Sequence, residues 1–90
     1  MRVNDIKTFF GGRVRELRKA RGWSQEDFAF RVGLDRSYVG GVERGERNIS
    51  LENISLIAAA LELSPSELFE GWSQKSLSSV RAQLQRTKDA

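Results

Sequence analysis

The chain lacks the side chains on which most small enzymes and metal sites depend. Its 90 residues contain no cysteine and no histidine. Disulfides and thiolate metal sites are therefore excluded, and the commonest general base and zinc ligand is absent. Catalysis would have to rest on carboxylates, lysine or serine, and no acidic residue lies in an apolar context that would raise its pKa. We therefore expect a protein that is not an enzyme and that uses no metal or other cofactor.

Long apolar runs are missing as well. No stretch approaches the roughly 20 apolar residues of a membrane span, and the N-terminus has no secretory apolar segment. We therefore expect a cytoplasmic protein. A chain of 90 residues is too short for a second hydrophobic core, so one folded domain is expected.

Positive charge is concentrated in two parts of the sequence. Residues 1–47 hold 11 lysines and arginines against 7 acidic residues, and residues 75–90 hold 4 against 1. Residues 48–74 hold none against 4. This uneven distribution predicts that one part of the molecular surface faces a polyanion.

Helix signals follow one another along the chain, whereas no stretch alternates with the period of a β-strand. The apolar stripe of the first helix recurs at steps of three and four residues. Four later starts have an N-cap with a hydrophobic staple, at Ser24, Asp35, Ser50 and Ser64. Four glycines stand where a left-handed residue ends a helix, at Gly22, Gly33, Gly45 and Gly71. We predict an all-α fold with helices over 5–21, 25–32, 36–44, 51–62 and 65–70.

The tail differs from the rest of the chain. We expect residues 1–71 to form the folded domain and residues 72–90 to form a polar, basic tail. Leu77, Val80 and Leu84 have helical spacing, which predicts a short extra helix over about 76–87 if it packs on something. The alternative is a disordered basic tail that adds non-specific attraction to DNA.

Two glycine pairs interrupt the predicted helices. For Gly11 and Gly12 we expect a close contact with another helix. Gly40 and Gly41 lie in the middle of the third helix, where together they cost about 1.5–2 kcal/mol relative to alanine. They allow the backbone to approach either DNA or a neighbouring helix, and the sequence leaves both alternatives open.

The second and third predicted helices are joined by Gly33, Leu34 and Asp35. Three connecting residues that begin with glycine fit the sharp turn of a helix-turn-helix. The stretches RVRELRKARGWSQEDFA, VGLDRSYVGGVERGERNIS and LENISLIAAALELSPSELF resemble the Cro and lambda-repressor-like (XRE) family of regulators. The segment LDRSYVGGVERGERN also resembles the controller proteins of restriction–modification systems. The resemblance implies a five-helix, lambda-repressor-like domain that regulates transcription, with its third helix in the major groove of double-stranded DNA.

The proposed DNA contacts follow from the positions of the side chains on these helices. Residues at the start of a recognition helix face the base edges, and arginine can donate two hydrogen bonds to guanine. Gly40 and Gly41 offer no side chain, so readout is expected to extend beyond the helix. The predicted base contacts are Arg36, Ser37, Tyr38 and Arg44, with Tyr38 equally compatible with the core. The predicted phosphate contacts are Gln25, at a helix N-terminus, and Arg47 and Asn48 in the following loop.

Two further expectations concern structure and assembly. The family resemblance implies that Arg18 and Glu43 form a buried ion pair between the first and third helices. One recognition helix is too short for the affinity of specific regulators, so a symmetric homodimer is expected. Its interface is predicted at Leu68, Phe69 and Trp72. The alternative for Leu68 and Phe69 is that they close the core of the monomer.

The sequence is also compatible with a second function. Some members of the resembled family are antitoxins, so the chain is also interpreted as an antitoxin-type protein-interaction module that binds DNA. Binding through several phosphates weakens steeply with salt, whereas binding to an apolar protein surface does not. RNA binding is a minor alternative because few exposed aromatic residues are expected.

Overall fold

A computed structural model of the chain describes residues 5–72 and 84–85. Within these residues the structure contains helices and no strand, which confirms the all-α prediction. The helices are α1 (Asp5–Ala20), α2 (Gln25–Val32), α3 (Arg36–Glu43), α4 (Leu51–Ala60) and α5 (Pro65–Leu68). Each helix begins at the predicted residue. Four of them end one or two residues earlier than predicted, because the last predicted residues belong to the turn that follows each helix.

Serine side chains cap three of the helices. Ser24 and Asp27 form a reciprocal capping box at α2, and Ser64 and Glu67 form another at α5. The backbone and side-chain hydrogen bonds with Ser64 lower the pKa of Glu67 below its ordinary value. Ser50 accepts a hydrogen bond from a backbone N–H in the first turn of α4. These bonds satisfy N–H groups that have no partner within their own helix.

The fourth predicted cap is only partly correct. Asp35 occupies the N-cap position of α3 with extended backbone, but its carboxylate makes no capping hydrogen bond. The position was predictable from the staple pair around it. The missing bond leaves the start of α3 less satisfied than the starts of α2, α4 and α5.

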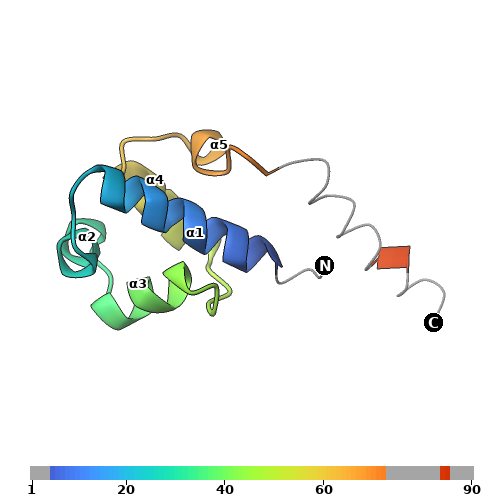
Figure 1. The fold of residues 1–90 in the computed structure, drawn as a ribbon, viewed down its shortest axis with the longest axis horizontal. Coiled ribbons are helices and arrows are strands. Elements are labelled where there is room, and N and C mark those ends of the chain that lie inside the picture. The colour runs from blue at the N-terminus through green and yellow to red at the C-terminus, as the bar shows by residue number, and fades with distance from the viewer. Residues whose placement is uncertain (1–4, 73–83, 86–90) are drawn as a thin grey trace.

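The hydrophobic core lies at the centre of the domain, where all five helices contribute side chains. In Figure 1, α3 and α5 lie on opposite sides of α1, and α4 lies behind it. Buried apolar side chains from every helix meet in this centre. The largest that are fully buried are Phe28, Ile57, Leu61, Leu68, Val14 and Val39.

The burial of Leu68 corrects part of the predicted dimer interface. Its side chain is fully buried in the monomer, so it cannot contact a partner. Phe69 packs with its ring 5.1 Å from the ring of Phe10, and Trp72 lies 5.3 Å from Phe9. Phe69 and Trp72 are only partly buried and remain available at the end of α5.

The two glycines of α1 have different surroundings. A Cβ atom on Gly11 would lie 2.2 Å from the carbonyl oxygen of Val42, so the predicted close helix contact is confirmed for Gly11. A Cβ atom on Gly12 would meet nothing within 4 Å, and the prediction is wrong for Gly12. Close packing of α1 on α3 therefore depends on Gly11.

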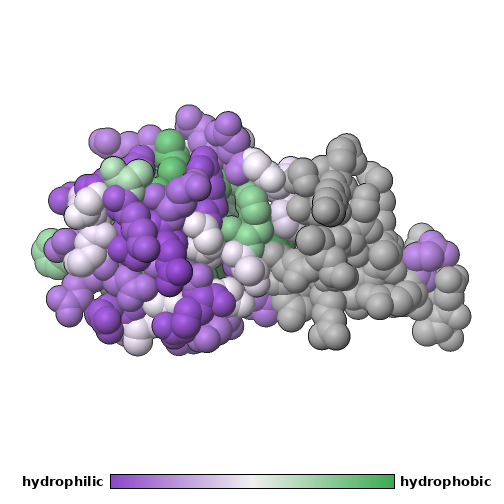
Figure 2. Space-filling view, in the orientation of Figure 1, coloured by the Kyte–Doolittle hydropathy of each residue, from purple (hydrophilic) through white to green (hydrophobic). Residues whose placement is uncertain are grey.

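The surface outside the core is mainly polar. Figure 2 shows hydrophilic side chains over most of the described part of one face, with apolar ones in small separate patches. Among residues 5–72 and 84–85, the large apolar side chains that are exposed are Phe30, Leu51, Leu56 and Leu84. Among the described residues, none of the helices is both long and apolar enough to cross a membrane. The helix predicted over 76–87 lies outside the described residues, apart from 84 and 85.

Candidate nucleic-acid interface

The turn between α2 and α3 fixes the orientation of α3. Gly33 ends α2 in the left-handed conformation, with φ of 82°, which glycine adopts without steric cost. The N–H groups of Gly33 and Leu34 both donate to the carbonyl of Ala29, at 2.9 and 3.0 Å. Val39 and Val42 then bury the inner face of α3. The result is the two-helix corner that the sequence predicts, with the start of α3 directed outward.

Polar and basic side chains occupy the start of α3. Arg36 and Ser37 are exposed, and the first turn contains no acidic residue. Free N–H groups and the helix dipole favour an anion at such a position. With Asp35 making no capping bond, the start of α3 combines unsatisfied donors with an arginine and a hydroxyl. This arrangement suits a phosphate or a hydrogen-bonding base edge.

Tyr38 links the core to this surface. It is partly buried, and its hydroxyl accepts a hydrogen bond from Nδ2 of Asn53 on α4 at 3.1 Å. The guanidinium of Arg47 lies 5.1 Å from the centre of the Tyr38 ring, within the range of a cation–π contact. Tyr38 therefore positions Arg47. Sequence reasoning missed Asn53, because only its place on α4 brings it to Tyr38.

A second basic residue follows α3 and has an acidic neighbour. Nε of Arg44 donates to Oε2 of Glu46 at 3.1 Å, and both side chains are more than half exposed. The hydrogen bond raises the pKa of Arg44 and lowers that of Glu46. Gly45 lies between them with a positive φ of 75°. Glu46 was absent from the predicted site. Its place two residues after Arg44, across a turn glycine, is the signal that would have indicated it.

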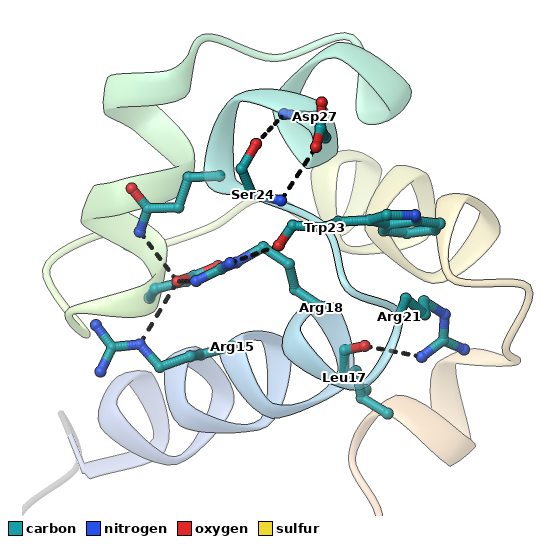
Figure 3. A network of polar contacts seen from close by, with 9 residues as sticks. Arg15, Leu17, Arg18, Arg21, Trp23, Ser24 and Asp27 are labelled. Carbon is teal, nitrogen blue, oxygen red and sulfur yellow. Dashed lines mark hydrogen bonds and ion pairs between the residues drawn. The ribbon is translucent and has the colours of Figure 1, made fainter.

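Beneath the exposed residues lies a buried ion pair that anchors α3 to α1. Arg18 donates from Nε to Oε2 of Glu43 at 2.7 Å and from Nη2 to Oε1 at 2.9 Å. Its third nitrogen, Nη1, donates to the carbonyl of Trp23 at 2.8 Å. Figure 3 shows Arg18 reaching from α1 into this network, with Arg15 beside it. The ion pair expected between Arg18 and Glu43 is therefore present.

The environment of Glu43 determines its charge. Burial by itself would raise the pKa of the Glu43 carboxyl group, but hydrogen bonds from Arg18 and Gln25 outweigh burial and lower this pKa. Arg15 adds a further cation, with Nε 3.6 Å from Oε1 of Glu43. In turn, the hydrogen bond to Glu43 raises the pKa of Arg18. Both partners of the pair are thus held in their charged forms.

The structure gives Gln25 a role in this network. Its Nε2 donates to Oε1 of Glu43 at 3.0 Å. An amide nitrogen carries two hydrogens, so a second donor remains for a phosphate. Gln25 also lies near Arg44, since both side chains border Gly40. Arg47 and Asn48 are exposed in the loop after α3. No cluster of acidic, histidine or cysteine side chains that could hold a metal ion is found within residues 5–72 and 84–85.

Comparisons with known proteins agree with this geometry. The family model described as Helix-turn-helix matches residues 14–68, which is more than half of the chain. The chain belongs to this helix-turn-helix family. Among the curated members, it is 47% identical to the control protein C.MunI of Mycoplasma sp. over 68 residues, with 74% of this chain and 92% of the relative covered. It is 43% identical to the control protein C.BamHI of Bacillus amyloliquefaciens, with 76% and 85% covered.

Solved structures of helix-turn-helix proteins have the same fold. The restriction–modification controller protein C.AhdI of Aeromonas hydrophila is 62% identical, with a TM-score of 0.70 over 72% of this chain and 98% of that chain. The controller protein C.Esp1396I is 34% identical, with a TM-score of 0.66 over 71% and 84%, and its structure is a tetramer in complex with its natural 35-base-pair operator. The family consists of DNA-binding transcription regulators, and the chain is therefore not an enzyme.

Proposed function

We propose that the protein is a sequence-specific transcription regulator of the restriction–modification controller type. It binds double-stranded DNA in the cytoplasm as a homodimer, with α3 in the major groove. The homology to control proteins and the operator complex of C.Esp1396I support this proposal.

The observation that carries the proposal is the two-sided character of α3. Its inner side is fixed by Val39, Val42 and the buried Glu43. Its outer start is exposed and carries Arg36 and Ser37. A helix whose position is fixed, and whose exposed N-terminal residues bear hydrogen-bond donors, is suited to reading base edges.

Phosphate contacts are assigned to the residues that flank this helix. Gln25 lies at the N-terminus of α2, and Arg47 and Asn48 lie in the loop after α3. Contacts on both sides of the groove would fix the register of α3 without reading sequence. Arg44 is assigned to a base, because it reaches back along the outside of α3 to Gly40.

A homodimer follows from the size of α3. Its eight residues span about 12 Å, which reaches too few base pairs for the affinity of a specific regulator. We assign the dimer surface to the end of α5, where Phe69 and Trp72 are partly exposed. Because α5 and α3 lie on opposite sides of α1 (Figure 1), association there leaves both copies of α3 free.

The antitoxin-type alternative is not favoured. The curated and structural relatives named above are control proteins of restriction–modification systems. The large exposed apolar side chains of the described residues are also scattered over α2, α4 and residue 84, whereas a protein-binding module presents a contiguous apolar patch.

Selection of bound sequences from random duplex DNA tests the function directly. We expect a recovered site with two-fold symmetry and half-sites about 34 Å apart, one turn of DNA. Recovery of no preferred sequence would contradict the proposal.

Sedimentation of the full chain at micromolar concentration tests the assembly. We expect a dimer for the wild type and dissociation for Trp72→Ala, with Phe30→Ala on α2 as the exposed aromatic control. A wild-type monomer that binds one molecule per site would contradict the dimer. A Trp72→Ala protein that remains dimeric would show that the dimer interface does not depend on Trp72 and lies elsewhere.

A further inference from the structure

The outer surface of α3 carries two adjacent glycines that are covered by arginine side chains. A Cβ atom on Gly40 would lie 3.1 Å from Nη1 of Arg44. A Cβ atom on Gly41 would lie 3.0 Å from Nε and 3.2 Å from Cγ of Arg47. Both glycines are buried, whereas the two arginines that cover them are exposed. The space that side chains at positions 40 and 41 would occupy therefore contains the arginines that follow.

These contacts differ in kind from those of Gly11. A Cβ atom on Gly11 would meet backbone carbonyl groups of Val42 and Glu43, which can move only if α1 and α3 separate. Cβ atoms on Gly40 and Gly41 would meet flexible side chains instead, those of Arg44 and Gln25 at position 40 and that of Arg47 at position 41. A methyl group at position 40 or 41 is therefore expected to displace an arginine and to leave the fold intact.

Each of the two arginines is also held from another side. Arg44 is bonded to Glu46 at 3.1 Å, and Arg47 lies over the ring of Tyr38 at 5.1 Å. The guanidinium group is a planar fork of donors that matches guanine O6 and N7 or a phosphate. A guanidinium group binds either partner only in the right orientation, and the surface on which the side chain lies sets that orientation. For Arg44 and Arg47 this surface is the backbone of α3 at Gly40 and Gly41.

We propose that Gly40 and Gly41 are positioning residues of the DNA interface, because they leave the space in which Arg44, assigned to a base, and Arg47, assigned to a phosphate, lie against α3. This inference rests on the proposed function. The DNA contacts of the second half of α3 then come from arginines located beyond the helix. Gly40 and Gly41 have no side chain with which to contact a base. They act by leaving room for the arginine side chains.

Alanine at each position tests the proposal, with Gly12→Ala as the matched control. Gly12 is also helical, and a Cβ atom there meets nothing within 4 Å. Thermal unfolding should show an equal or higher midpoint for all three variants, since alanine is the better helix former. The ratio of affinity for the selected site to affinity for unrelated duplex DNA should fall by about tenfold for Gly40→Ala, which displaces the base-contacting Arg44. Gly41→Ala displaces a phosphate contact, so it should lower the affinity for both duplexes by a similar factor. Neither the ratio nor the affinities should change for Gly12→Ala.

A double-mutant cycle shows whether each glycine substitution affects DNA binding through the arginine that it contacts. Gly40→Ala should change the ratio less than about twofold when Arg44 is already alanine. Gly41→Ala should change the affinity for either duplex less than about twofold when Arg47 is already alanine. Equal losses in both backgrounds would overturn the proposal, as would a lowered unfolding midpoint, or an unchanged ratio in Gly40→Ala together with unchanged affinities in Gly41→Ala. A wild type that does not distinguish the two duplexes would instead refute the proposed function.

Discussion

Two arginine–glutamate pairs meet at the end of α3, and their surroundings are opposite. Arg18 and Glu43 are joined at 2.7 Å, with 9% and none of their side-chain surface exposed. Arg44 and Glu46 are joined at 3.1 Å, with 56% and 58% exposed. Breaking a buried pair strands a charge in the interior, whereas an exposed pair contributes only about 0–1 kcal/mol. The first pair is therefore a fixed part of the fold, and the second can open to a ligand at little cost.

The comparison explains how one short helix serves two roles. Glu43 and Arg44 are adjacent in sequence, yet one holds α3 to α1 and the other lies on the predicted DNA side. An ion pair by itself does not identify a binding site. Here the two roles are separated by burial.

The largest effect is expected when the buried pair is broken. Glu43→Ala leaves Arg18 without its carboxylate, so the free energy of unfolding should fall by about 3–5 kcal/mol. Urea unfolding measures it. Arg18→Met combined with Glu43→Ala should recover much of the loss, and Glu46→Ala is the matched control with an exposed carboxylate. A loss below about 0.5 kcal/mol in Glu43→Ala would contradict the structural role of the pair.

The stabilising role of the buried pair should also appear in the pH dependence of the free energy of unfolding. The pKa of Glu43 is lowered in the folded protein, so its contribution to stability is complete above the ordinary glutamate pKa of about 4.3. The contribution is lost as the pH falls through the lower folded-state pKa. Urea unfolding over this range should give a steeper pH dependence for the wild type than for the Arg18→Met, Glu43→Ala double variant. Equal slopes would mean that Glu43 is not the group responsible.

Among the exposed residues, the loss of Arg47 should weaken DNA binding most uniformly. Arg47→Ala should reduce affinity for all duplexes by a similar factor and flatten the dependence of log affinity on log salt by about one unit. Gln25→Ala should weaken binding without a change in slope, because glutamine is uncharged. A wild-type slope for Arg47→Ala in fluorescence anisotropy titrations would remove Arg47 from the phosphate contacts.

The smallest effect is expected from opening the exposed pair. Glu46→Gln removes a negative charge beside the predicted DNA surface and frees Arg44. The free energy of unfolding should change by less than about 0.5 kcal/mol, and affinity for duplex DNA should rise about two- to threefold at low salt. Weaker binding would mean that Glu46 positions Arg44 for DNA and does not compete with it.

The helix starts and the left-handed glycines were predictable because they depend on local chemistry. Ser24 and Ser64 bond within their own turns, and Gly33 needs only its own backbone angles. Asp35 matched the same pattern without forming the bond, since a staple pair fixes the position of a cap and not the rotamer of its side chain.

Features that depend on distant contacts were less predictable. Gly11 and Gly12 are adjacent and identical in sequence, yet only Gly11 faces the backbone of α3. Leu68 fitted an interface as well as a core, because a periodic pattern does not reveal what covers the apolar side. The Arg44–Glu46 pair depends on the turn at Gly45, and the bond from Asn53 to Tyr38 depends on where the fold places α4 relative to Tyr38.

The most direct test of the central claim compares wild type with Arg36→Ala on two duplexes at one fixed salt concentration. One duplex carries the selected site and the other an unrelated sequence. Base contacts specify and phosphate contacts position, so the wild type should prefer its site strongly. Arg36→Ala should lose about 1–3 kcal/mol of that discrimination while retaining non-specific binding. An unchanged ratio of the two affinities would contradict the claim that the start of α3 reads the DNA sequence.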